Sequence, residues 1–233
     1  MSRALAIESS GRISSVALVE NERVLDEQQF PHGLQNAAQM LPLIDGMMCG
    51  CGWEPKSLEQ LYLSVGPGSF TGLRIAVTLA KTLALTTGVK IVAVPTLRVL
   101  VENAPAEAND VIVLLDAKRE QVFTARYQRS SQTWIEQESP RLETVASMLA
   151  RAPRPVHLLG EGIPYHRQFI PEEAGIIVTP ESTWRARASV VAQLAIEMAR
   201  RGEFADPFTL TPTYIRKPEA LEKWEIENAK NGM

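Results

Sequence analysis

The segment with the clearest chemical pattern spans residues 66–76 and reads Gly-Pro-Gly-Ser-Phe-Thr-Gly-Leu-Arg-Ile-Ala. The apolar run at 61–65 before it indicates a buried strand, and residues 77–87 after it have the composition of a helix. A glycine-rich turn between a strand and a helix is an arrangement that binds phosphate through backbone N–H groups. A P-loop, however, needs Gly-Lys-Ser/Thr where this chain has Gly72-Leu73-Arg74, and the glycine spacing departs from the dinucleotide pattern. Neither common nucleotide motif explains the segment.

Three other turns place an acid or paired glycines at the end of a predicted strand. They are Glu8-Ser9-Ser10-Gly11, Asp116-Ala117-Lys118-Arg119 and Gly160-Glu161-Gly162. In phosphate-binding duplicated folds such turns hold the phosphates of a nucleotide, and the acid holds the metal ion or the water. The alternative for residues 8–11 is a plain hairpin, and the alternative for residues 116–119 is a solvated turn with a local ion pair. For residues 160–162 it is a glycine turn with a purely structural role. Both interpretations stay open at this point.

Other catalytic and metal-binding patterns are absent from the sequence. It has no Gly-x-Ser-x-Gly elbow, no His-Glu-x-x-His and no His-x-x-x-His pair. Cys49 and Cys51 stand in Cys-Gly-Cys-Gly, and cysteines two residues apart fit disulfide geometry poorly. We therefore expect reduced thiols at a helix end, no hydrolase triad, no metal site and a cytoplasmic protein.

Composition narrows the class of protein further. The 233 residues include 24 Lys and Arg against 27 Asp and Glu, which gives a net charge of −3. A protein that grips a nucleic-acid backbone alone needs a basic face, and this balance argues against one. No apolar run approaches the roughly 18 residues that a membrane-spanning helix needs. The chain opens on a strand-like segment without a signal peptide.

The order of predicted elements repeats once along the chain. The first half has predicted strands at 3–7, 15–19, 24–30, 61–65 and 89–94 and helices at 34–48, 71–87 and 96–103. The second half has predicted strands at 111–115, 121–127, 133–138, 156–159 and 176–178 and helices at 142–151 and 189–201. We expect Ser189 and Gly202 to cap the last helix. The pattern predicts a duplicated β-β-β-α-β-α-β-α unit, with lobes at 1–104 and 105–216 and a tail or short helix at 217–233.

The helix after the glycine-rich turn carries small residues at every fourth position: Gly72, Ala76, Ala80 and Ala84. Such a ridge lets another helix approach closely, and that helix belongs either to a partner or to this chain's own segment 34–48. Arg74 lies in the first turn, where the helix dipole disfavours a cation by about 0.3–1 kcal/mol. We interpret it as a ligand for a partner's carboxylate. Methionines on the neighbouring helix add adaptable apolar surface: Met40, Met47 and Met48.

The chain resembles the TsaB (YeaZ) family over essentially its whole length. The segments that carry the resemblance are Leu5-Ala6-Ile7-Glu8-Ser9-Ser10, residues 66–75, Val94-Pro95-Thr96-Leu97, residues 116–123 and Pro212-Thr213-Tyr214-Ile215-Arg216. The resemblance implies an α/β fold of the actin-like ATPase (ASKHA) superfamily with two ribonuclease H-like lobes. It also implies a role in making N6-threonylcarbamoyladenosine in tRNA.

The resemblance assigns the chemistry to the paralogue TsaD, whose metal-binding His-x-x-x-His this chain lacks. TsaB-like proteins pair with themselves or with TsaD through two helices that match 34–48 and 71–87 here, and the ATPase TsaE joins the complex. This implies a scaffold without cofactor or metal that meets tRNA only through the complex. The expected partner-contact residues are Leu34, Met40, Leu41, Met48, Gly72, Arg74, Ala76, Ala80 and Lys81.

Two rival hypotheses stand beside the scaffold. An actin-fold ATPase or kinase would use Glu8 and Asp116, whereas a glycoprotease would need a nucleophile pattern that the sequence lacks. In the scaffold hypothesis the phosphate turns are vestigial. The residues of this vestigial nucleotide site are Glu8, Ser9, Ser10, Gly11, Asp116, Gly160 and Gly162.

Overall fold

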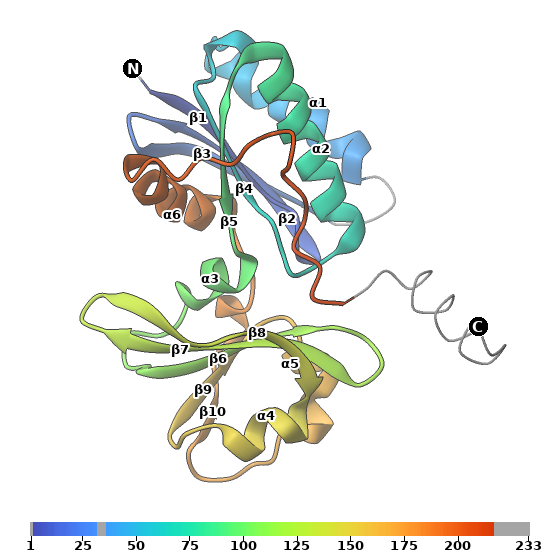
Figure 1. Ribbon diagram of the computed structural model, residues 1–233, viewed down its shortest axis with the longest axis vertical. Coiled ribbons are helices and arrows are strands. Elements are labelled where there is room, and N and C mark those ends of the chain that lie inside the picture. Colours follow the sequence, from blue (N-terminus) through green and yellow to red (C-terminus); the bar gives the residue numbers. More distant parts are fainter. Residues whose placement is uncertain (1, 32–35, 217–233) are drawn as a thin grey trace, which may run out of the picture.

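The computed structural model describes residues 2–31 and 36–216 and shows two stacked lobes, each built on one five-stranded sheet (Figure 1). Leu34 and the predicted tail at 217–233 lie outside the described residues. In the described part of the chain, no helix is both long enough and apolar enough to cross a membrane.

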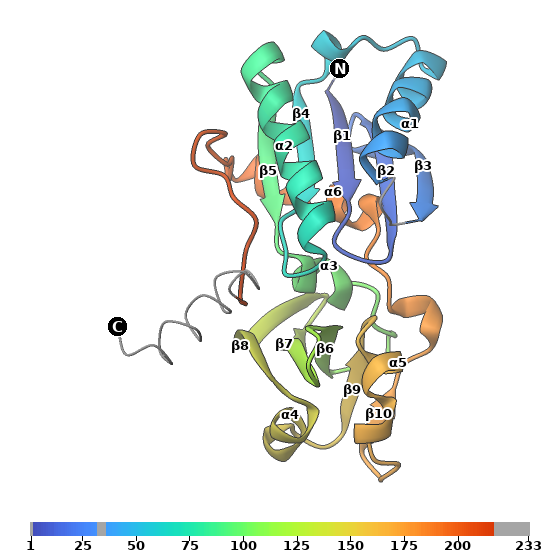
Figure 2. The same cartoon turned by 90° about the vertical axis from the view of Figure 1, so that its right-hand side faces the viewer.

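The first sheet has the strand order β3-β2-β1-β4-β5. Its bounds are β1 Arg3–Glu8, β2 Ile13–Glu20, β3 Arg23–Pro31, β4 Gln60–Ser64 and β5 Lys90–Val94. β1, β2 and β3 pair antiparallel, and β4 pairs parallel to both β1 and β5. Helices α1 (Asn36–Gly50) and α2 (Phe70–Thr87) lie side by side over one face (Figure 2). The central strand β1 is buried on both faces, which explains its continuous apolar run.

The second sheet repeats this topology. Its bounds are β6 Asp110–Asp116, β7 Gln121–Ser130, β8 Thr133–Thr144, β9 Val156–Leu159 and β10 Ile176–Val178. The order β8-β7-β6-β9-β10 matches that of the first sheet strand for strand. Helices α4 (Val145–Arg151) and α5 (Ile163–His166) follow β8 and β9. The predicted duplication of a β-β-β-α-β-α-β-α unit is therefore present in the structure.

The last helix of each repeat packs on the sheet of the other. α3 (Thr96–Val101) places Leu97 and Leu100 in the core of the second sheet. α6 (Ala188–Arg200) places Val191 and Ala195 against the face of the first sheet that α1 and α2 leave free. The two lobes are thus joined by an exchange of helices as well as by the chain.

This exchange changes two sequence-based assignments. Residues 188–200 belong by packing to the first sheet, although the sequence places them in the lobe at 105–216. Ser189 is not the predicted N-cap, because the helix begins directly after Arg187. Instead its backbone N–H and hydroxyl donate to the two carboxylate oxygens of Glu27 on β3, at 3.0 and 2.7 Å. A carboxylate from the first lobe therefore satisfies the start of α6.

Boundaries differ most around α4. β8 runs to Thr144 rather than 138, and α4 begins at Val145 rather than 142. The Thr144 hydroxyl accepts from the Ser147 N–H at 3.2 Å, an N-cap that sets this start. The sequence also missed α5 and three short 3-10 helices, η1 Pro55–Ser57, η2 Arg167–Phe169 and η3 Glu181–Thr183.

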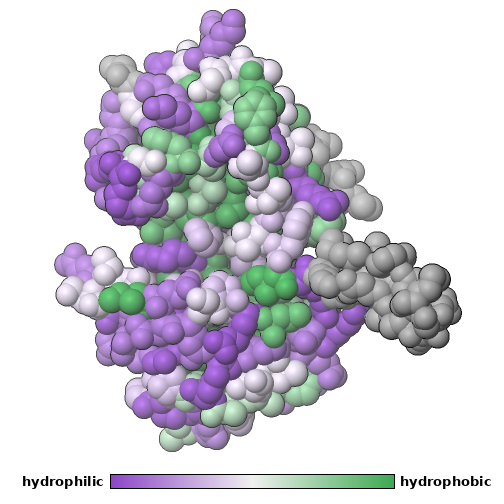
Figure 3. Space-filling view, in the orientation of Figure 1, coloured by the Kyte–Doolittle hydropathy of each residue, from purple (hydrophilic) through white to green (hydrophobic). Residues whose placement is uncertain are grey.

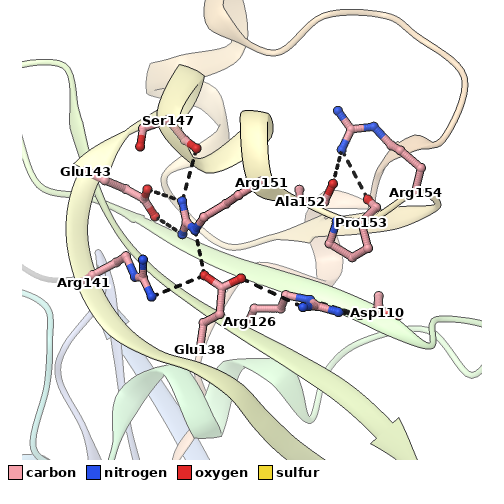
Figure 4. Close-up of polar contacts among 10 residues, drawn as sticks. All are labelled: Asp110, Arg126, Glu138, Arg141, Glu143, Ser147, Arg151, Ala152, Pro153 and Arg154. Carbon is pink, nitrogen blue, oxygen red and sulfur yellow. Dashed lines mark hydrogen bonds and ion pairs between the residues drawn. The ribbon is translucent and has the colours of Figure 1, made fainter.

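A network of ion pairs ties β8 to β7 and α4 in the second lobe (Figure 4). Arg151 donates to Glu138 at 2.7 Å and to Glu143 at 2.5 Å, and Arg126 on β7 pairs with Glu138 on β8 at 3.9 Å. The Glu143 side chain is only 8% exposed. Burial by itself raises the pKa of Glu143, but hydrogen bonds from Arg151 and Thr124 outweigh it and hold the pKa below its ordinary value.

We expect Glu143→Gln to lower the free energy of unfolding at neutral pH by about 2 kcal/mol, because it breaks a buried charged pair. A carboxylate with a lowered folded-state pKa stabilises above its unfolded pKa of about 4.3, and this contribution disappears as the pH falls through the folded pKa. The difference from wild type should therefore shrink in acid. Urea unfolding at neutral pH and in acid measures it. Glu172→Gln is the control, since Glu172 is 87% exposed in its pair with Arg167; equal losses in both variants would contradict the expectation.

Candidate functional site

The acid of the first hairpin turn is sealed inside the protein. Glu8 is fully buried at the end of β1, and its Oε1 accepts from the backbone N–H and the hydroxyl of Ser10 at 2.6 and 2.5 Å. Its Oε2 is buried without a hydrogen bond among the described residues. Burial raises the pKa of Glu8, the hydrogen bonds from Ser10 offset this in part, and the nearby Glu161 raises the pKa further. The geometry gives Glu8 no open path to a nucleotide.

The glycine-rich turn is packed on the first hairpin and on the late segment 210–216. The Ser69 N–H donates to the carbonyl of Ser10 at 2.7 Å, and the Ser9 hydroxyl donates to the carbonyl of Gly72 at 2.9 Å. The carbonyl of Gly66 accepts from the Thr96 N–H at 2.9 Å. Ser69 also caps α2, because its hydroxyl accepts from the Gly72 N–H at 3.3 Å. The turn thus joins parts of its own chain where a phosphate loop would present open N–H groups.

The acid of the second hairpin has a histidine partner that the sequence did not reveal. Asp116 Oδ1 lies 2.9 Å from Nε2 of the buried His166 on α5, and it accepts from the Lys118 N–H at 3.1 Å. In the same region a Cβ on Gly162 would lie 2.9 Å from the Asp116 nitrogen, so the two turns touch. Asp116 is thereby oriented within its own lobe.

The first hairpin also meets the glycine turn of the second lobe. Glu161 Oε2 accepts from the Arg12 N–H at 3.0 Å, and the Arg12 guanidinium lies 4.6 Å from the centre of the Tyr165 ring. A cavity of about 660 Å³ opens between the lobes and includes Ser15, Asn103 and Arg187 in its lining. The contact between Arg12 and Glu161 brings the predicted vestigial residues of the two lobes to one interlobe junction, but none of them is among the residues that line this cavity. The sequence-based prediction of site residues did not include Arg12, Tyr165 or His166. For Glu161, the position between two glycines was the one sequence feature that pointed to the junction.

Five of the predicted partner-contact residues lie in the core of the first lobe: Met40, Met48, Gly72, Ala76 and Ala80. In that cluster the small residues of α2 pack with the methionines of α1 and with the first sheet. The ridge of small residues therefore faces this chain's own core, where α2 packs on β4 and β5 of the first sheet. In the described structure these five side chains are not available to a partner.

The two cationic side chains of α2, Arg74 and Lys81, bind the segment 208–214 near the end of the described chain. Arg74 stacks on Phe70, 3.7 Å from the ring centre, and its Nε donates to the Tyr214 hydroxyl at 3.0 Å. Lys81 donates to the carbonyls of Phe208 and Leu210 at 3.4 and 3.3 Å. Internal contacts thus account for Arg74 and Lys81 without a partner's carboxylate, and contact with a partner stays a prediction.

Of the predicted contact residues Leu41 is plainly exposed, at 53%. It belongs to the outer helix face, which we define as the exposed residues of α1 and α2: Gln39, Leu41, Pro42, Asp45, Gly46, Cys49, Gly50, Phe70, Thr71, Arg74, Thr78, Thr82, Leu85 and Thr86. Asp45 and Arg74 are the charged members among these described positions. On the face of the molecule that Figure 3 draws, the second lobe is mainly hydrophilic. A low number of charged side chains is a feature of the core of a surface that another protein covers.

Among the residues that the structure describes, no group of three His, Cys, Asp or Glu side chains is placed to hold a metal ion.

Comparison with known proteins places the chain in a family. Residues 34–224 match the family model described as "TsaD: tRNA N6-adenosine threonylcarbamoyltransferase". The chain is 32% identical, over 97% of its length and 99% of the relative's, to the tRNA threonylcarbamoyladenosine biosynthesis protein TsaB of Bacillus subtilis. It is 25% identical, over 95% of its length and 97% of the relative's, to the TsaB protein of Escherichia coli.

The solved structures agree on the fold. YeaZ from Pseudomonas aeruginosa superposes with a TM-score of 0.77 at 24% identity, covering 92% of this chain and all of that one. This likeness and the two matching sheets confirm the predicted α/β fold with two lobes. On the shared sequence and fold, this chain belongs to the TsaB (YeaZ) family.

Proposed function

We propose that this chain is a non-catalytic scaffold subunit in the biosynthesis of tRNA threonylcarbamoyladenosine. It supports a TsaD-like catalytic subunit, works with a TsaE-like ATPase, meets tRNA only through that complex and acts in the cytoplasm. The names of its relatives and the matched family model support the pathway. The observation that carries the scaffold role is the contrast between a sealed Glu8 and an exposed outer helix face with few charges.

The outer helix face is the proposed contact with a TsaD-like subunit and, in its absence, with a second copy of this chain. α1 and α2 are held rigidly from beneath by the buried cluster of Met40, Ala76 and their neighbours. A rigid, shallow surface of this kind loses little conformational entropy on binding. Leu41 and Leu85, at 53% and 58% exposure, are its apolar anchors.

Leu41→Glu is expected to weaken self-association and TsaD association at least about tenfold, or about 1.4 kcal/mol, because the new charge would be desolvated in the contact. Sedimentation of the variant with and without a TsaD-like subunit measures this. Ile135→Glu is the matched control, because Ile135 is 49% exposed but lies on β8 of the other lobe. If Leu41→Glu associates as wild type does, the outer helix face is not the contact.

The rival ATPase function predicts a different result. It needs Glu8 and Asp116 open to a nucleotide, but Glu8 is buried beneath Ser10 and Asp116 is held by His166. We expect calorimetry of the isolated chain with ATP and Mg²⁺ to show no micromolar binding and no turnover. Binding with turnover that Glu8→Gln abolishes would reject the scaffold proposal in favour of the ATPase.

A further inference from the structure

Two buried polar atoms without a hydrogen bond lie in register on neighbouring strands of the first sheet. They are Oε2 of Glu8 and the hydroxyl oxygen of Ser64, which have no hydrogen-bond partner among the described residues, and both residues are completely buried. β1 and β4 run parallel with Ile7 opposite Leu63, so Glu8 and Ser64 come next along the pair. Neighbouring strands lie about 4.8 Å apart, and residues at the same step point to the same face. The two side chains therefore lie beside each other.

Hydroxyl groups and one like charge surround the Glu8 carboxyl. Ser10 on the hairpin turn donates to Oε1 through its N–H and its hydroxyl, at 2.6 and 2.5 Å. Burial raises the pKa of Glu8 most, the hydroxyls of Ser10 and Ser64 lower it in part, and the negative charge of Glu161 in the second lobe raises it again. The net direction is upward, toward a protonated carboxyl.

Glu8 forms no ion pair in the described structure. Arg12 is the nearest cation in the sequence, but its guanidinium lies 4.6 Å from the centre of the Tyr165 ring. On β2 the residue opposite Glu8 is Ser15, whose hydroxyl accepts from the Ala188 N–H at 2.8 Å. A buried carboxylate without a cation is strongly unfavourable, whereas a buried carboxylic acid needs only hydrogen-bond partners. In the acid form Oε2 becomes a donor, and the buried hydroxyl oxygen on β4 is the acceptor beside it.

We propose that Glu8 is a neutral acid whose Oε2–H donates to Ser64, and that this proton holds the first hairpin against the glycine-rich turn. Ser10 connects the two segments, because it binds the Glu8 carboxyl while its own carbonyl accepts from the Ser69 N–H at 2.7 Å. Loss of the proton leaves an uncompensated charge beside Ser10, so the contact between the segments weakens. The proposal concerns one chain alone and does not depend on the scaffold role.

The first test measures urea unfolding of wild type and Glu8→Gln as a function of pH. A carboxyl whose folded-state pKa lies above its unfolded value of about 4.3 stabilises fully below that value, and this contribution is lost as the pH rises through the folded-state pKa. Glu8→Gln keeps an acceptor for Ser10 and a donor for Ser64 but cannot ionise. It should therefore lack this part of the pH dependence, match wild type near pH 4 and have the higher midpoint at neutral pH.

Glu143→Gln is the matched control, because Glu143 is also buried but accepts from Arg151 at 2.5 Å. The same substitution there should lower the midpoint at neutral pH, an effect of opposite sign. If Glu8→Gln also lowers the midpoint at neutral pH, or keeps the full pH dependence of wild type, Glu8 is ionised in the folded chain and the proposal is wrong.

Carbon-13 NMR of the wild-type chain detects the proton without any variant. The Glu8 carboxyl carbon, assigned through its own backbone amide, should keep the shift of a protonated acid at pH 7, with the 87% exposed Glu172 as the reference. A Glu8 carbon that titrates together with that of Glu172 would overturn the proposal. Ser64→Ala should lower the pH at which Glu8 titrates, because it removes the acceptor of the neutral form. A rise would show that Ser64 donates to an ionised carboxylate instead.

Hydrogen exchange tests the connection to the glycine-rich turn. The Ser69 amide should exchange faster in wild type than in Glu8→Gln at any pH above the titration of the Glu8 carbon, because only wild type then carries the buried charge. Comparison of the two chains at the same pH cancels the base catalysis of exchange itself. Equal exchange in both chains above that titration would contradict the proposed role of the proton in holding the turn.

Discussion

Ala76→Glu is expected to leave the chain unfolded, because Ala76 is completely buried between α2 and the rest of the first-lobe core. A glutamate there would bury an unpaired charge and overfill the packed core between α2 and the first sheet. Burial of an unpaired charge is one of the mechanisms behind losses of more than about 4 kcal/mol, and overpacking adds about 1–3 kcal/mol. A domain with a total stability of about 5–15 kcal/mol does not tolerate this loss. Far-ultraviolet circular dichroism and thermal unfolding of the purified variant measure it.

Thr78→Glu is the matched control, two residues further along the same helix. Thr78 belongs to the outer helix face and is exposed, so this variant should fold with a melting temperature close to that of wild type. The two variants distinguish a ridge that is needed for folding from a ridge that contacts a partner. If the ridge is buried in the core, folding requires alanine at position 76 and tolerates glutamate at position 78. If Ala76→Glu folds but no longer associates with a partner, the small-residue ridge is part of the partner interface and the prediction is wrong.

The repeated order of strands was predictable because it rests on local patterns, whereas the four-residue helix α5 was missed. The continuous apolar runs of 4–7 and 111–115 mark central strands, and the period of apolar residues in α6 marks a helix with one buried face. Which sheet that helix covers is a property of tertiary structure. The exchange of α3 and α6 between the lobes therefore had no local signal, and neither did the replacement of the Ser189 cap by Glu27.

The candidate site shows the same division. Gly72, Ala76 and Ala80 at every fourth position indicate a face that packs closely, but spacing does not say that its neighbour is this chain's own sheet instead of a helix. Arg74 finds its partner Tyr214 140 positions further along the chain, and Glu161 reaches Arg12 across 149 positions. Contacts over such separations leave no periodic pattern in the sequence. The sequence therefore suggested a carboxylate of another protein as the partner of Arg74, because the helix dipole disfavours a cation at that position.

Gly68→Ala is expected to destabilise the protein by about 3 kcal/mol or more, because overpacking and backbone strain act together. A Cβ at this position would lie 2.5 Å from the carbonyl oxygen and 2.7 Å from the Cβ of Ser10. Neither atom can move freely, since that carbonyl also accepts from the Ser69 N–H at 2.7 Å and Ser10 holds the Glu8 carboxyl. Relief of the clash would separate the glycine-rich turn from the first hairpin.

Gly46→Ala provides a control of opposite sign. Gly46 lies inside α1, and nothing stands within 4 Å of the position that its Cβ would take. The same change there should stabilise by about 0.5–1 kcal/mol, because alanine loses less backbone entropy in a helix. Denaturant midpoints of the two variants compare the effects directly. A small effect of Gly68→Ala, similar in size to that of Gly46→Ala, would mean that the turn and the hairpin are not in contact in solution. The long glycine motif would then need a purpose other than the joining of Ser69 to Ser10.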